Sequence, residues 1–119
     1  MVIDPKKFED IVRQALDDLP ERFQPFLENV AVLVEEEPHP DDLEHVGLDP
    51  DEELFGLYHG VPLTDREVGY TGLPDRVIIY RGPILRSCAT SREVQRQIRE
   101  TVIHEIGHHL GLGDDDMVF

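Results

Sequence analysis

The residues with the clearest chemical meaning stand near the C-terminus, where His104, Glu105 and His108 form the pattern HExxH. On a helix, residues four apart lie on one face, so this spacing brings two imidazoles together with a carboxylate beside them. Neutral imidazoles are good ligands for zinc, and a neighbouring carboxylate can act as a general base toward water. The pattern therefore predicts a metal site capable of hydrolysis.

A third ligand is available a few residues further along, because the full stretch reads HExxHxxGxxD. Gly111 suits the left-handed residue that ends a helix and turns the chain back toward the metal. That turn would bring the carboxylate of Asp114 to the site. Asp115 and Asp116 compete for the same role, and because they follow Asp114, a solvated acidic tail is the alternative for Asp114.

A catalytic zinc keeps three protein ligands and one position for water. His104, His108 and Asp114 supply that number, so we expect them to bind Zn²⁺. Glu105, about 100° around the helix from His104, is expected to be the base rather than a ligand. His109 points to another side, which predicts a structural or supporting role. The alternative for the motif histidines is a pair of ordinary histidines in a polar helix end.

Other polar residues are weaker candidates. Four of them end predicted strands that could border a cleft, where each could polarise a substrate carbonyl, with core packing or a surface position as the alternative: Tyr58, His59, Tyr80 and Arg81. His39 and His45 stand in an acidic stretch and are expected to be exposed. Cys88 is expected to be a small buried or surface thiol rather than a nucleophile.

The helix that carries the motif has a clear sequence signal. Thr90 and Glu93 predict a capping box at its start. Its apolar face follows at four-residue spacing and consists of Val94, Ile98, Val102 and Ile106. Because the two motif histidines lie on a neighbouring face, the apolar face can pack on a sheet while the imidazoles face a cleft.

A second amphipathic helix is predicted near the N-terminus. Asp4 and Pro5 form an N-cap with proline at the first helical position, and apolar residues then repeat at helical spacing until Pro20. Residues 23–27 suggest a further short helical turn. Two long helices at the ends of the chain therefore frame the middle of the sequence.

The middle of the chain is rich in strand signals. Residues 30–34, 54–59 and 76–81 are strand candidates, the first of them interpreted as a buried strand that ends at a run of three glutamates, the last as one closed by Gly82 and Pro83. Residues 38–53 hold three prolines and many acids, which predicts a surface loop. The expected fold class is α+β, with a small mixed sheet packed by the N-terminal and C-terminal helices in a single domain, residues 1–119.

Composition limits the function classes. With one cysteine the chain forms no internal disulfide and no cysteine-rich zinc site. It shows no signal-peptide pattern and no apolar stretch of membrane-spanning length, so we expect a soluble cytoplasmic protein with no membrane partner. The net charge of −15 argues against a nucleic-acid partner and would attract a basic peptide or a cation. Solubility is the alternative reason for this acidity.

Three segments, residues 57–63, 77–81 and 101–114, resemble the small single-domain zincin-like metallopeptidase family of bacteria. They match in order and cover most of the chain from about residue 49 onward. The resemblance implies a minimal zincin fold, with helices packed on a small sheet and the active-site helix near the C-terminus, and a peptidase activity. Metzincins have a third histidine where this chain has Asp114, an exchange also found in snapalysin-like zincins and one that zinc tolerates.

Three functions compete at this stage. The first is a zinc-dependent metallopeptidase that binds a peptide or protein substrate as an added strand along residues 54–59. The second is a non-enzymatic zinc-binding or interaction module with the same fold, favoured by how few residues after Asp114 are available to form the lower wall of a cleft. The third, zinc-dependent hydrolysis of a non-peptide amide, has the same sequence signature as the first.

Overall fold

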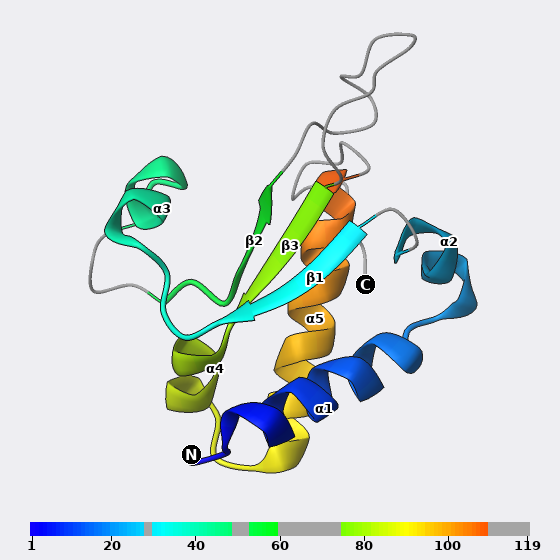
Figure 1. Cartoon of the computed structure of the whole chain (residues 1–119), viewed down its shortest axis with the longest axis horizontal. Helices are drawn as coiled ribbons and strands as arrows, with labels where there is room; N and C mark the ends of the chain where they lie inside the picture. Colours follow the sequence, from blue (N-terminus) through cyan, green and yellow to red (C-terminus); the bar gives the residue numbers. More distant parts are fainter. Residues whose placement is uncertain (28–29, 49–52, 60–74, 110–119) are drawn as a thin grey trace, which may run out of the picture.

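A three-stranded mixed sheet lies at the centre of the protein and is covered on one face by two long helices (Figure 1). The computed structural model describes residues 1–27, 30–48, 53–59 and 75–109, and for Phe26, His45, His108 and His109 it describes the backbone alone. The elements in chain order are α1 (Pro5–Asp17), η1 (Glu21–Phe23), α2 (Gln24–Leu27), β1 (Val30–Glu35), α3 (Pro40–His45), β2 (Gly56–His59), β3 (Asp75–Tyr80), α4 (Arg81–Ser87) and α5 (Ser91–His109). This arrangement confirms the predicted α+β class.

Helix α1 begins as its capping sequence predicts. The Asp4 side chain accepts a hydrogen bond of 2.9 Å from the Lys7 backbone N–H, and Pro5 occupies the first turn. Its buried residues, Phe8, Val12 and Ala15, follow the predicted spacing. The helix therefore packs one apolar face on the protein and leaves its charged face in water.

Helix α5 is capped by Thr90 and Glu93, as predicted. The Glu93 backbone N–H donates to Oγ1 of Thr90 at 3.1 Å, and the Glu93 carboxylate accepts from the Ala89 N–H at 2.7 Å. The second bond reaches one residue further back than in the usual capping box. Two otherwise unpaired donors at the start of the helix are thereby satisfied.

Among the strands that the structure describes, the order is β1-β3-β2, so β3 is central and the other two are the edges of the described sheet. β1 pairs with β3 in parallel, with Val32 opposite Val77, while β2 pairs with β3 antiparallel, with Gly56 opposite Ile79. The mixed sheet and all three strand predictions are confirmed, although β2 begins at Gly56, two residues later than predicted. Of the two outer strands, β2 is the one that packs beside α5.

Two predictions in the first half of the chain were wrong. β1 is not fully buried: every second residue is exposed, with Leu33 at 42%, because an edge strand is covered on one face only. The stretch predicted as a loop contains the helix α3, in which Pro40 occupies the first turn and His39 acts as N-cap, accepting a hydrogen bond from the Asp41 N–H.

The segment after β3 also differs from the prediction. Gly82 and Pro83 do not close a strand but belong to the first turn of α4. A proline is tolerated there because its missing N–H would have had no partner inside the helix. The Gly82 N–H itself donates to the Glu36 carbonyl at 2.8 Å, which ties the start of α4 to the end of β1.

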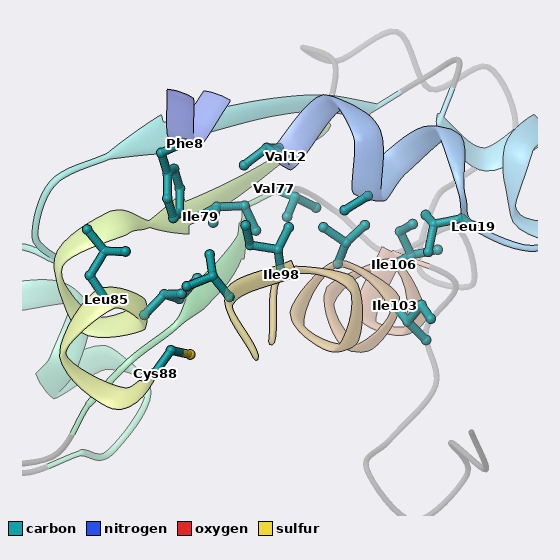
Figure 2. Close-up of a cluster of buried hydrophobic side chains, with 14 of the residues drawn as sticks. Phe8, Val12, Leu19, Val77, Ile79, Leu85, Cys88, Ile98, Ile103 and Ile106 are labelled. Carbon is teal, nitrogen blue, oxygen red and sulfur yellow. The ribbon is translucent and has the colours of Figure 1, made fainter. Parts of the chain in front are cut away.

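The main hydrophobic core lies between the sheet, α1 and α5 (Figure 2). Its α5 residues include the predicted face, Val94, Ile98, Val102 and Ile106, all fully buried, and the sheet contributes Val77 and Ile79. A smaller cluster of Leu57, Ile78 and Tyr80 covers the opposite face of the sheet. Within the described residues, no helix is long and apolar enough to cross a membrane.

Candidate metal centre

The HExxH motif lies in the last turns of α5, as the sequence predicts. His104 is partly exposed and Glu105 is only 6% exposed. Both line a cavity of about 330 Å³ between α5 and the segment that leads into β2. The cavity therefore brings a possible metal ligand and the expected base to one accessible site.

The walls of this cavity come from two elements. The β2 side consists of Glu53, Leu54, Phe55 and Gly56, and the α5 side adds Gln97, Glu100 and Thr101 to the two motif residues. With Glu53, Glu100 and Glu105 among them, the wall is rich in carboxylates. This local charge has the same sign as the whole chain, so the cavity should attract cations and basic groups.

Glu53 is held in place by an arginine from another part of the fold. Arg86 on α4 donates to both carboxylate oxygens of Glu53, at 3.1 and 3.0 Å, and to both of Glu37, at 2.7 and 2.8 Å. The hydrogen bonds from Arg86 lower the pKa of Glu37 below its ordinary value. Arg86 thus connects α4, the residues after β1 and the wall of the cavity.

The other predicted ligands fall at or beyond the end of the described part. His108 belongs to α5, one turn after His104, but its side chain is not described. Gly111, Asp114, Asp115 and Asp116 lie outside the described residues. Among the residues that are described, no group of three or more histidine, cysteine or acidic side chains could hold a metal ion, and the predicted set has two members outside that search.

The candidate auxiliary residues are distributed over both faces of the sheet. Tyr58 packs against the main core and donates to Asp75, whereas Tyr80 belongs to the cluster on the opposite face and donates to Asp42 at 3.5 Å. Burial, followed by the negative charge of Asp42, raises the pKa of Tyr80. Arg81 forms an ion pair of 2.6 Å with Glu36 at the start of α4. His59 ends β2 and is partly exposed.

The remaining candidates have structural surroundings. His39 caps α3 with an exposed side chain, as expected of a surface histidine. The side chain of His45 is outside the described part. Cys88 is buried, and burial, followed by the charge of Glu93, raises the pKa of its thiol. A thiol with a raised pKa is a poor nucleophile, which agrees with the expected structural role.

Sequence reasoning missed three residues of the cavity region. Gly56 reads as an ordinary strand residue, although its missing side chain lets β2 approach Thr101 and Glu105 closely. Arg86 and Glu53 are 33 positions apart, so no local spacing could connect them. Helical spacing could have identified Glu100 and Gln97 as cavity residues. They precede His104 by one and two helical turns and therefore lie on the same side of α5.

The donor set suits zinc. An imidazole on the cavity wall, with a second histidine one helical turn further along the same helix, is the arrangement that zinc ligation requires. Glu105, the residue after His104, is buried and can act as a base, because the metal does not need its carboxylate as a ligand. The two described members of the motif, His104 and Glu105, are therefore compatible with the metal that the motif implies.

A model of the zincin-like metallopeptidase family matches residues 27–118, which include the whole sheet and all of α5. This chain belongs to the zincin-like metallopeptidase family. Among solved structures, it is similar to a conserved hypothetical protein from T. thermophilus, with 25% sequence identity, a TM-score of 0.59, and coverage of 91% of this chain and 94% of that one. None of the curated proteins compared with it matches. Family membership confirms the resemblance inferred from the motif segments.

Proposed function

We propose that this member of the zincin-like family is a zinc-dependent peptidase, with Glu105 as its general base. The observation that supports the proposal most is the placement of Glu105. This residue is 6% exposed and lines the same cavity as His104, from the adjacent position on α5. A base must lie within reach of the water it activates and of the bond it breaks, and this cavity gives room for both.

His104, His108 and Asp114 would hold the metal in this proposal. A zinc ion bound there would polarise the peptide carbonyl and lower the pKa of a water molecule toward neutrality. The chain's own contribution is the proton transfer. Glu105 accepts the proton of the attacking water as its oxygen adds to the carbonyl carbon, and then gives it to the amide nitrogen. The C–N bond breaks, leaving a carboxylic acid and an amine.

Substrate binding is proposed along the segment that leads into β2. β2 is an edge of the described sheet, and an extended peptide can add to such an edge through main-chain hydrogen bonds. The same segment, from Glu53 to Gly56, forms one wall of the cavity. Because that wall and the facing side of α5 carry carboxylates, we propose that substrates with basic side chains bind best.

The first experiment is to measure the metal content of the purified protein and to digest a peptide library with and without a chelator. Cleavage that the chelator stops and added zinc restores would support the proposal. Cleavage that is indifferent to the chelator would contradict it. Zinc binding without cleavage of any peptide would favour the second candidate, a non-enzymatic zinc-binding module.

The second experiment assigns the base. Glu105→Gln keeps the shape of the side chain but loses its basicity, so we expect normal folding and zinc content with cleavage lowered by at least about 100-fold. Glu44→Gln is the control, because Glu44 is an exposed helical glutamate on α3 that does not line the cavity. Equal cleavage by wild type and Glu105→Gln would show that Glu105 is not the base.

A further inference from the structure

A second cavity, of about 340 Å³, lies between the end of α1 and the first half of α5, where the two helices pack together (Figure 1). It has no part in the mechanism above. Its lining combines three arginines of α5 with residues of both helices: Arg92, Arg96, Arg99, Gln95, Ala15 and Asp18. All three arginines are exposed. In a chain with 11 basic residues and a net charge of −15, this gathering of positive charge calls for an explanation.

The three arginines share one side of α5, which we call the arginine face. Arg92, Arg96 and Arg99 follow one another at intervals of four and three residues, the spacing of neighbours on a helix surface. At about 100° per residue, His104 is turned by about 80° to 140° from each of them. The two cavities share no lining residue. The arginine face is therefore separate from the candidate metal centre.

The guanidinium groups of the arginine face form no ion pair with any residue that the structure describes. Other arginines of this acidic chain do form such pairs. Arg13 pairs with an aspartate, and Arg81 and Arg86 pair with glutamates. The arginine face is thus a positive surface that the described part of the fold does not neutralise.

The acids closest to the arginine face have other places or partners. Glu93 caps α5, with its carboxylate accepting from the Ala89 N–H at 2.7 Å. Glu100 lines the cavity of the candidate metal centre. Asp18 lines the arginine cavity, but its Oδ2 accepts a hydrogen bond of 3.4 Å from the side-chain amide of Gln95. Because one carboxylate faces three guanidinium groups, the wall of this cavity is positive.

The arginine face does not serve the stability of α5. Arg92 stands in the first turn, where the positive end of the helix dipole disfavours a cation. Like charges one turn apart repel, so Arg96 is unfavourable beside each of its two arginine neighbours. Three positive charges that weaken their own helix and lack a described ion pair indicate a ligand from outside.

The spacing of the arginines suits an extended acidic peptide. The arginine face spans seven helical residues, about 10.5 Å, and its four-residue interval is about 6 Å along the axis. In an extended peptide, alternate side chains lie on the same side, about 6.6 Å apart. Alternate acidic residues of such a peptide can therefore meet successive arginines. Each guanidinium can bind a carboxylate through two parallel hydrogen bonds.

We propose that the arginine face docks an extended acidic segment of a partner protein. The net charge of the chain repels such a segment at long range. At physiological ionic strength, however, charges are screened beyond about 8 Å, so a bound segment responds mainly to the arginines beside it. This docking site goes beyond the proposed function and does not depend on zinc.

The first test is direct binding to the full-length protein. The probe is a short fluorescent peptide in which glutamate and serine alternate, and the matched control peptide has glutamine in place of glutamate. Fluorescence anisotropy at physiological ionic strength measures both. We expect the acidic peptide to bind, the control peptide not to bind, and the affinity to fall as salt is added. No binding of the acidic peptide would overturn the proposal.

The second test locates the binding site. The test variant combines three exchanges, Arg92→Gln, Arg96→Gln and Arg99→Gln. The control variant loses the same number of positive charges from exposed positions on α1, through Lys6→Gln, Lys7→Gln and Arg13→Gln. We expect the test variant to bind the acidic peptide about tenfold more weakly or worse, and the control variant to lose less than about twofold. Equal losses would mean that only the overall charge matters, which would overturn the proposal.

A structural role for the arginine face is separated by stability. If the arginines serve a partner, the test variant should melt at the same temperature as the control variant or higher, because repulsion within α5 is removed. If they instead stabilise the fold, by offsetting Asp18 and the negative end of the α1 dipole, the test variant should melt clearly below the control. That result would overturn the proposal.

Competition identifies the class of ligand. Inorganic phosphate and a single-stranded oligonucleotide are each added to the complex with the acidic peptide. We expect neither to displace the peptide at concentrations equal to that of the peptide. Displacement by phosphate would show a simple anion site. Displacement by the oligonucleotide, with direct binding that the test variant loses, would show a nucleic-acid site. Either result would overturn the acidic peptide as the ligand.

Discussion

Gly56 on β2 and Thr101 on α5 approach so closely that a β-carbon on Gly56 would lie 2.5 Å from Cγ2 of Thr101. The same β-carbon would lie 3.1 Å from the Ile78 carbonyl oxygen and 3.7 Å from Cγ of Glu105. A glycine at this position therefore sets the distance between the outer strand and the helix that carries the motif. It also keeps the space beside Glu105 open, at the wall of the proposed active site.

Gly56→Ala should destabilise the protein and disturb the cavity. Overpacking of this kind costs about 1 to 3 kcal/mol in the free energy of unfolding. Chemical denaturation measures the loss. Thr101→Ser removes the clashing Cγ2 but keeps the hydroxyl that accepts from Gln97, so the double variant should recover part of the stability. A double variant no more stable than Gly56→Ala would show that the contact with Thr101 is not the cause.

Zinc binding should depend on the two motif histidines. We expect one zinc per chain in the wild type and none in His108→Ala or His104→Ala, because two imidazoles one turn apart are the centre of the site. Elemental analysis gives the answer. His39→Ala serves as the control, since His39 caps α3 and does not line the cavity. Full zinc content in His108→Ala would mean that the motif is not the metal site.

The third ligand should be Asp114 rather than its neighbours. Asp114→Ala should weaken zinc affinity by about tenfold or more, while Asp115→Ala and Asp116→Ala should stay near the wild type, because the spacing after Gly111 favours the first carboxylate. Competition with a chelator ranks the three variants. A strong effect at Asp115 or Asp116 would contradict the spacing argument without removing the zinc site.

The Arg86–Glu37 contact should contribute a small, pH-dependent stability. The pKa of Glu37 is lowered in the folded protein from an ordinary value of 4.5. The stabilisation is therefore present above pH 4.5 and is lost as the pH falls through the lower folded value. Since both side chains are 52% exposed, we expect less than about 1 kcal/mol. Denaturation of wild type and Glu37→Gln at pH 7 and pH 3 should show a larger difference at pH 7 than at pH 3.

Arg86→Gln should have a larger effect on substrate binding than Glu37→Gln. Arg86 holds Glu53 in the cavity wall as well as Glu37. Its loss frees the Glu53 side chain, so we expect KM to rise by roughly threefold to tenfold with little change in kcat, because binding rather than proton transfer is altered. Steady-state kinetics on a cleaved peptide test this. A fall in kcat at constant KM would place Arg86 in another role.

Much of the local structure was predictable because its causes lie within a few residues in the chain. The Asp4 and Thr90 caps each act on an N–H group three residues away, and the apolar face of α5 follows from helical spacing alone. The relative placement of the two motif histidines is equally local, because residues four apart on a helix share a face. Helices α3 and α4 escaped prediction because prolines usually mark turns, and their place in a first helical turn was not recognised.

The sequence by itself determined the α+β class, the helix that carries His104 and Glu105, and the family to which the chain belongs. Only the tertiary structure decided which strands are edges, how closely Gly56 approaches α5, and which side chains Arg86 and Asp75 contact. These relationships join residues far apart in the chain, so they depend on how the sheet and helices pack rather than on any local pattern. The spacing of residues along the chain determines which side chains can act together, and the packing of the sheet and helices determines where they lie in the protein.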